Sequence, residues 1–227
     1  ESSLKNRLLG NYDETMSYMS RAKSCESKTN IYLDYNKRPV IIMLHDFFDS
    51  PHIYQWLLFP DFWSWTYETL NFCGKNNIPI LVKPHPNQIP ENQVVIEALQ
   101  KLFMIYKLIN WISKDIQNSS LFLESPKLII TAYGSVAAEA TYSGIPVLLA
   151  GDHPGINFDV GRVAKSKQDY FHYLSNPSEV KAGNVSDAVL FTALHYKNTL
   201  TEERNHSIVD ALGLSLTNFS CNYAIYQ

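Results

Sequence analysis

Cysteine is scarce in this sequence of 227 residues, which contains only Cys25, Cys73 and Cys221. Their odd number and wide spacing exclude a paired disulfide framework and offer no zinc motif, so a reducing cytoplasmic setting is expected. Long hydrophobic runs are also lacking. None approaches the roughly 20 residues that cross a bilayer, and no secretory leader is recognisable at the start. The formal net charge of −3 argues against binding of nucleic acid by bulk electrostatics.

Short apolar runs rich in branched side chains recur along the chain and alternate with segments of helical periodicity. Asp61 is expected to cap one helix and Gly74 to end it. This alternation predicts an α/β fold, a Rossmann-like doubly wound parallel sheet with helical N- and C-terminal extensions. The expected strands are 39–44, 78–82, 108–112, 127–131 and 145–150, and the expected helices are 2–23, 61–73, 92–106, 118–123 and 135–142.

Three parts of the chain differ in character, and they give the expected domain boundaries. Residues 1–38 are polar and predict a helix and a linker, and the chain starts with Glu1 rather than Met, as a fragment or trimmed chain does. Residues 39–175 carry the alternating pattern and form the expected Rossmann-like domain. Residues 176–227 predict a helical extension.

The sharpest motif is Lys83-Pro84-His85-Pro86, directly after the second expected strand. In doubly wound sheets, ligands bind in the loops at the carboxyl ends of the strands. The two prolines fix the backbone on either side of the imidazole, and the neighbouring lysine suits an anionic ligand such as a diphosphate. The alternative is a rigid turn with a surface histidine.

A second motif, Gly134-Ser135 with Glu139 one turn later, follows the fourth expected strand. A glycine before a helix lets backbone amides approach a phosphate, and the helix N-terminus favours negative charge. Ser135 adds a hydroxyl at the cap position, and Glu139 is a candidate acceptor for ribose or sugar hydroxyls. The alternative is a serine cap with a solvated glutamate.

Two further loops hold ionisable residues at the same expected edge. The first apolar run leads into His45, Asp46, Asp49 and His52, without the G-x-G-x-x-G turn that an NAD-binding domain needs. The spacing of these four residues does not support a metal cluster, so no metal site is predicted. We expect a substrate-facing loop instead, partly anchored by an aspartate that accepts from backbone amides. The last loop contains Asp152 and His153, which either contact the sugar or form a plain turn.

The motifs at 83–86, 134–139 and 144–147 together resemble the donor-binding, C-terminal lobe of bacterial capsule and surface-polysaccharide glycosyltransferases with the GT-B fold. The resemblance covers about residues 39–175. The wider set includes capsule Kdo transferases, glycerophosphotransferases and bacterial sialyltransferases with a His-Pro motif. An E-x7-E pair and an N-terminal Rossmann lobe, which many such enzymes have, do not appear.

The resemblance implies a metal-independent enzyme that takes a nucleotide sugar, with cytidine nucleotides favoured, and no separate cofactor. His85 and Ser135 are the expected catalytic contacts to the donor phosphates. Lys83, Gly134, Glu139, His52, Asp152 and His153 are expected to bind substrate, and Asp49 or His45 is a candidate catalytic base. A glycan acceptor and a peripheral place at the inner membrane or in a polysaccharide-assembly complex are implied too. Two alternatives stay open: a non-catalytic nucleotide- or glycan-binding module of such a complex, and an epimerase-like enzyme.

Overall fold

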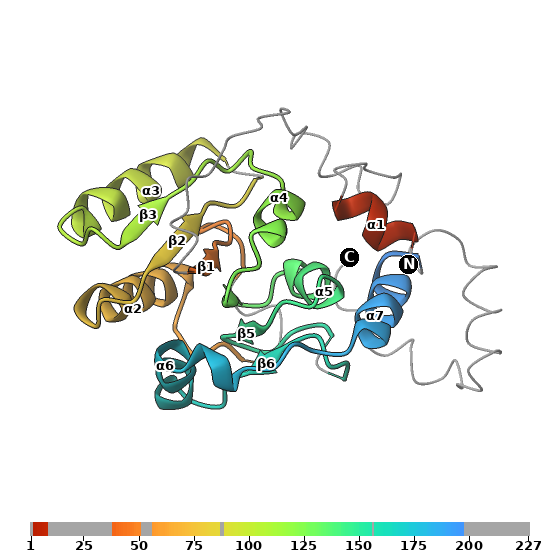
Figure 1. Cartoon of the computed structure of the whole chain (residues 1–227). Helices are drawn as coiled ribbons and strands as arrows, with labels where there is room; N and C mark the ends of the chain where they lie inside the picture. The colour runs from red at the N-terminus through yellow and green to blue at the C-terminus, as the bar shows by residue number, and fades with distance from the viewer. Residues whose placement is uncertain (1, 9–37, 51–55, 87–88, 156, 198–227) are drawn as a thin grey trace.

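A parallel β-sheet covered by helices on both faces forms the body of the protein (Figure 1). The computed structural model describes residues 2–8, 38–50, 56–86, 89–155 and 157–197. The six strands are parallel and lie in the order β3-β2-β1-β4-β5-β6. They are β1 (Val40–Met43), β2 (Ile80–Lys83), β3 (Ile109–Trp111), β4 (Leu128–Thr131), β5 (Val147–Leu149) and β6 (Arg162–Val163).

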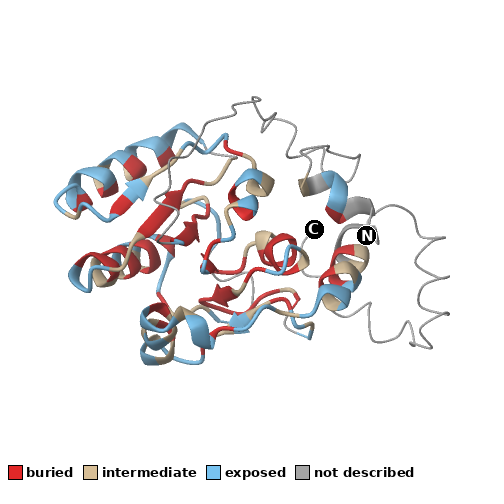
Figure 2. Ribbon diagram, in the orientation of Figure 1, coloured by how far each residue is buried: buried red, intermediate tan, exposed pale blue. Residues whose placement is uncertain are grey.

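Alternate residues of the buried strands face two separate cores, as expected for a sheet covered on both sides. On one face Val40, Ile42 and their neighbours pack against α2, α3 and α6; on the other, Ile41 and Met43 pack against α4, α5 and α7. Figure 2 shows the central strands buried between these helical layers, whereas β3 and β6 at the edges of the sheet are partly exposed. The helices are α1 (Ser2–Leu8), α2 (Phe62–Lys75), α3 (Pro90–Phe103), α4 (Asn118–Leu123), α5 (Val136–Tyr142), α6 (Lys167–Ser175), the 3₁₀ turn η2 (Pro177–Glu179) and α7 (Val185–Lys197).

The expected doubly wound sheet is confirmed, and five of its strands fall where the apolar runs predict them. The sixth, β6, was missed because it is only two residues long and one of them is the polar Arg162. The helix expected over 2–23 is described only as α1, and its remainder lies outside the described residues. α1 and α7 both pack against α5, while the predicted domain boundaries at 38 and 175 stay predictions.

The two ends of α2 show one correct expectation and one error. Asp61 caps the helix as predicted, because its carboxylate accepts a hydrogen bond from the Ser64 amide at 2.6 Å. Gly74 does not end it: the helix continues to Lys75, and Asn77 takes the positive φ of 53°. Gly74 is there for packing, since a Cβ at this position would lie 2.6 Å from the Tyr106 ring. No helix in the described ranges is long and apolar enough to cross a membrane.

Candidate functional site

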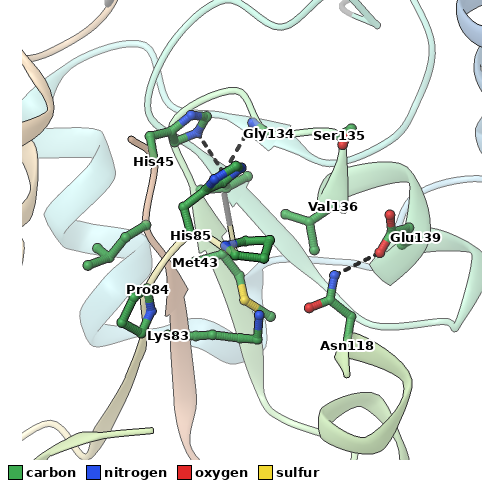
Figure 3. Close-up of a pocket in the computed structure, with 13 residues that line it drawn as sticks. Met43, His45, Lys83, Pro84, His85, Asn118, Gly134, Ser135, Val136 and Glu139 are labelled. Carbon is green, nitrogen blue, oxygen red and sulfur yellow. Dashed lines mark hydrogen bonds between the residues drawn. The ribbon is translucent and has the colours of Figure 1, made fainter. Parts of the chain in front are cut away.

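A pocket opens at the carboxyl ends of β1, β2 and β4 (Figure 3). In the sheet, β1 lies between β2 and β4. The strands that follow β1 in sequence are added first on the β2 side and then on the β4 side, so the pocket lies at the point where the strand order reverses. Ligands of doubly wound sheets bind at this topological switch point. The hollow, together with the open solvent at its mouth, encloses about 500 Å³. Its lining consists of Met43, Leu44, His45, Lys83, Pro84, His85, Pro86, Asn118, Thr131, Gly134, Ser135, Val136 and Glu139.

Lys83 supplies a buried cation to this pocket. It is the last residue of β2, its side chain is only 4% exposed, and Nζ donates to the carbonyl of Lys114 at 3.3 Å. Burial lowers the pKa of Lys83 to about 8, while the carboxylates of Glu139 and Asp115 oppose that shift. At neutral pH the ammonium is therefore charged but poorly hydrated, a state that an anionic ligand would stabilise.

His85 and Ser135 line the same pocket, although 50 positions separate them in the sequence. His85 is half-buried between Pro84 and Pro86, so its backbone has little freedom. Ser135 stands at the N-cap position of α5, but its side chain makes no capping hydrogen bond. Since α5 is only 7 residues long, its dipole is a small source of positive potential compared with Lys83.

The Thr131 hydroxyl fixes the turn that carries Ser135. Its oxygen accepts from the Gly134 amide at 3.1 Å and lies 3.2 Å from Nε2 of His45. A Cβ on Gly134 would come within 2.7 Å of this oxygen, so the turn requires glycine. This differs from the expected role of Gly134, because its amide is already engaged by Thr131 rather than offered to a phosphate.

His45 forms part of the pocket floor as a neutral imidazole. Its ring stacks on Phe62 with centroids 4.8 Å apart, and its Nε2 accepts from the Tyr133 amide at 3.4 Å. The same nitrogen can accept from the Thr131 hydroxyl, which places the ring proton on Nδ1. Burial, reinforced by His85 and His153, lowers the pKa of His45 to about 3. A ring with that pKa is a weak base, which argues against His45 as the residue that deprotonates an acceptor.

Glu139 is buried and faces Asn118 across the pocket. One of its carboxylate oxygens accepts from Nδ2 of Asn118 at 2.8 Å (Figure 3). The alternative of a solvated glutamate is therefore wrong. The sequence did not single out Asn118 or Thr131. Asn118 is the first residue of α4, which follows β3. Its position near the carboxyl ends of the strands was the one indication in the sequence that it lines the pocket.

His153 and Asp152, expected to contact substrate, lie outside the pocket lining. His153 is buried and both ring nitrogens engage the backbone: Nδ1 accepts from the Gly155 amide at 2.9 Å, and Nε2 donates to the Gly134 carbonyl at 3.2 Å. His153 therefore stabilises the turn at Gly134 through its hydrogen bond to the Gly134 carbonyl. Asp152 is buried with Oδ1 lacking a hydrogen-bond partner, and burial raises its pKa.

The aspartates of the first loop act as local anchors, as one of the expectations for this loop proposed. Asp46 accepts from the Phe48 amide at 2.9 Å, and the exposed Asp49 accepts from the Ser50 amide at 2.8 Å. Neither lines the pocket. His52 lies outside the described residues. Within the described ranges, no group of three or more His, Cys, Asp or Glu side chains could hold a metal ion.

No protein-family model and no curated protein matches the sequence, but solved structures do. HepE from Anabaena, in complex with UDP and glucose, aligns with a TM-score of 0.50 and 12% identity over 79% of this chain and 49% of its own. Sucrose-phosphate synthase from Thermosynechococcus elongatus aligns with a TM-score of 0.45 and 13% identity, over 81% of this chain and 47% of its own. UDP-GlcNAc 2-epimerase from Neisseria meningitidis, bound to UDP-GlcNAc, aligns with a TM-score of 0.43 and 16% identity, over 86% of this chain and 51% of its own.

The chain thus spans about half the length of these structures. The likeness to HepE concerns the fold. Together with the strand order, it confirms the expected fold class, a Rossmann-like sheet that matches one lobe of the GT-B architecture.

Proposed function

We propose that this chain is the donor-binding lobe of a metal-independent, nucleotide-sugar-dependent glycosyltransferase of surface-polysaccharide synthesis, and that the pocket binds the donor diphosphate. The observation that carries the proposal is the convergence of Lys83, His85 and Ser135 on one hollow at the topological switch point. The HepE structure, which shares this fold, contains UDP and glucose, and the sequence motifs resemble capsule-type transferases.

The pocket residues suit the charge that develops as the donor reacts. An acceptor hydroxyl oxygen attacks the anomeric carbon, the bond from that carbon to the diphosphate oxygen breaks, and the diphosphate leaves with the electron pair. Lys83 and His85 would meet this negative charge from one side, and the hydroxyl and amide of Ser135 from the other. Glu139, held by Asn118, would accept hydrogen bonds from ribose or sugar hydroxyls.

The acceptor proton needs a base, and His45 and Asp49 are the two candidates on this chain. His45 is neutral, buried and engaged at Nε2, so it is assigned to the pocket floor. Asp49 is exposed on the loop that leaves β1 and is the candidate that a glycan acceptor could reach. A second lobe, as in the two-lobed enzymes that the sequence resembles, is the other source.

Calorimetry with CMP, CDP and UDP tests the proposal on this chain. We expect a pyrimidine nucleoside diphosphate to bind. The sequence resemblance favours cytidine, whereas the UDP in HepE favours uridine. Replacing Lys83 with Met, which keeps the alkyl stem but removes the charge, should weaken binding at least tenfold. Lys165→Met, at an exposed lysine outside the pocket lining, is the matched control.

Absence of binding by all three nucleotides, or equal affinity in the Lys83→Met and control variants, would overturn the proposal. Turnover then separates the classes: binding together with transfer to a glycan by the full-length protein supports the enzyme. Binding without any turnover supports the non-catalytic module, and interconversion of sugar epimers supports the epimerase-like enzyme.

A further inference from the structure

Four exposed apolar side chains gather at and beside one turn, at the opposite edge of the sheet from the pocket. Met104 and Ile105 are 77% and 74% exposed, and Leu102, one position before the end of α3, is 51% exposed. Leu108, directly before β3, is exposed as well. In Figure 1 this turn lies at the left, where α3 ends and β3 begins. A group of exposed apolar side chains in one turn is a candidate interaction surface.

The turn is held rigidly, so these side chains project because of the fold. The Tyr106 amide donates to the Phe103 carbonyl at 3.0 Å, and the Ile109 amide donates to the Tyr106 carbonyl at 3.1 Å. The Tyr106 ring fills the space left by Gly74 on α2. Tyr106 thus anchors the turn inward while Met104 and Ile105 point outward.

Cations surround this apolar turn. Lys101 and Lys107 flank it in the sequence, and Lys75 ends α2 on the other side of Tyr106. All three are exposed, and within the described residues none of them forms an ion pair. The nearest acid along α3, Glu97, accepts instead from Gln93.

The positive edge continues along the neighbouring strands. The Ile80 amide donates to the Leu108 carbonyl and the Val40 amide to the Pro79 carbonyl, while the Lys127 amide donates to the Pro39 carbonyl. These bonds place the amino ends of β3, β2, β1 and β4 side by side, which brings the exposed Arg38 and Lys127 to the same edge. The chain as a whole carries −3, so this positive charge is a local concentration.

We propose that this amino edge is a docking surface for a bilayer containing anionic phospholipids. Apolar side chains projecting between lysines match both layers of such a surface, the acyl region and the negatively charged headgroups. The inference goes beyond the proposed function and does not depend on it. Docked in this way, the domain would keep its pocket, at the carboxyl edge, open to the aqueous side.

Flotation of the full chain with vesicles tests this surface. We expect binding to vesicles of phosphatidylglycerol and phosphatidylcholine, loss of that binding at high salt, and none to phosphatidylcholine alone. The double variant Lys101→Gln with Lys107→Gln should lower the partition coefficient roughly 30-fold. Met104→Ser with Ile105→Ser should lower it roughly tenfold or more.

Matched controls carry the same changes elsewhere: Lys165→Gln with Lys181→Gln, and Val185→Ser with Leu190→Ser, all exposed positions outside this edge. Failure to bind anionic vesicles, or equal losses in the control and edge variants, would overturn the proposal. Self-association without lipid that disappears in the Met104→Ser, Ile105→Ser variant would also overturn it, in favour of a second copy as the occupant. Urea denaturation of the same variants shows whether they fold, and this control does not depend on nucleotide binding at the pocket.

Discussion

The chain contains two His-Pro turns, each shortly after a strand, and the structure places them in different environments. His85 follows β2 and lines the open pocket, whereas His153 follows β5 and is buried with both ring nitrogens bound to the backbone. The residues that precede them differ in charge: Lys83 is a buried cation and Asp152 a buried carboxyl group. Burial favours the neutral form of each side chain, so it lowers the pKa of Lys83 and raises the pKa of Asp152.

The difference shows that the dipeptide alone does not assign a histidine to a ligand. Pro84 and Pro86 fix the backbone on both sides of His85. After His153 only one proline follows, and Gly155 brings its amide within 2.9 Å of Nδ1. The ring of His85 lines the pocket, whereas the ring of His153 donates to the Gly134 carbonyl.

The largest expected effect is on catalysis, at the pocket turn. His85→Ala in the full-length protein should lower the rate of sugar transfer by about 10²–10³, because a preorganised group facing the leaving diphosphate is lost. Ser135→Ala should act in the same direction. The free energy of unfolding, measured in urea, should change little for either variant, since neither side chain is deeply buried. Full activity with both residues replaced would show that neither contributes to catalysis.

The buried turn should show the opposite pattern. His153→Ala removes two hydrogen bonds and the contact of the ring with Phe191, whose centroid lies 5.2 Å away. We expect a loss of about 3 kcal/mol in the free energy of unfolding. Urea denaturation of His153→Ala and His85→Ala side by side measures the contrast. Loss of activity in His153→Ala with an unchanged free energy of unfolding would contradict the structural role assigned to His153.

The sequence predicted the sheet well because each central strand is a short apolar run, and burial on both faces requires that pattern. It also predicted that Lys83, His85 and Glu139 would share one edge, since the carboxyl ends of parallel strands meet there. The roles of individual atoms could not be predicted. Whether a loop imidazole lines a pocket or is held by the backbone depends on tertiary hydrogen bonds, such as that from His153 to a carbonyl 19 positions away.

The same limit applies to the glycines. Gly74 looked like a helix stop, but it is required by the ring of Tyr106, a contact 32 positions along the chain that local pattern does not encode. Gly134 looked like a place where an amide binds a phosphate, but its amide donates to the Thr131 hydroxyl. In both cases the residue type was informative, and its partner emerged only in three dimensions.

A smaller effect concerns pH at the pocket turn. The pKa of Lys83 is about 8, so below that value the ammonium is charged and attracts the diphosphate. Nucleotide affinity should change little between about pH 7, where the terminal phosphate is ionised, and about pH 8, and then fall by up to about tenfold per pH unit. Binding raises the pKa of the lysine, so calorimetry at pH 8.5 in buffers of different ionisation enthalpy should detect proton uptake. His85→Ala should bind more weakly but keep this pH dependence; an affinity independent of pH up to 10 would exclude Lys83 from anion binding.

The smallest effect is expected at Asp152, the buried acid of the second turn. Because its folded pKa lies above its unfolded value of 3.8, its contribution to stability is present at low pH and is lost as pH rises through the folded pKa. Asp152→Asn removes the ionisation and should raise the free energy of unfolding at pH 7 by about 1 kcal/mol, with little difference at pH 4. Nucleotide affinity should stay the same, since Asp152 lies outside the pocket lining. A variant that is less stable at pH 7, or that binds nucleotide more weakly, would mean that the charged carboxylate serves the pocket and that the two turns act together.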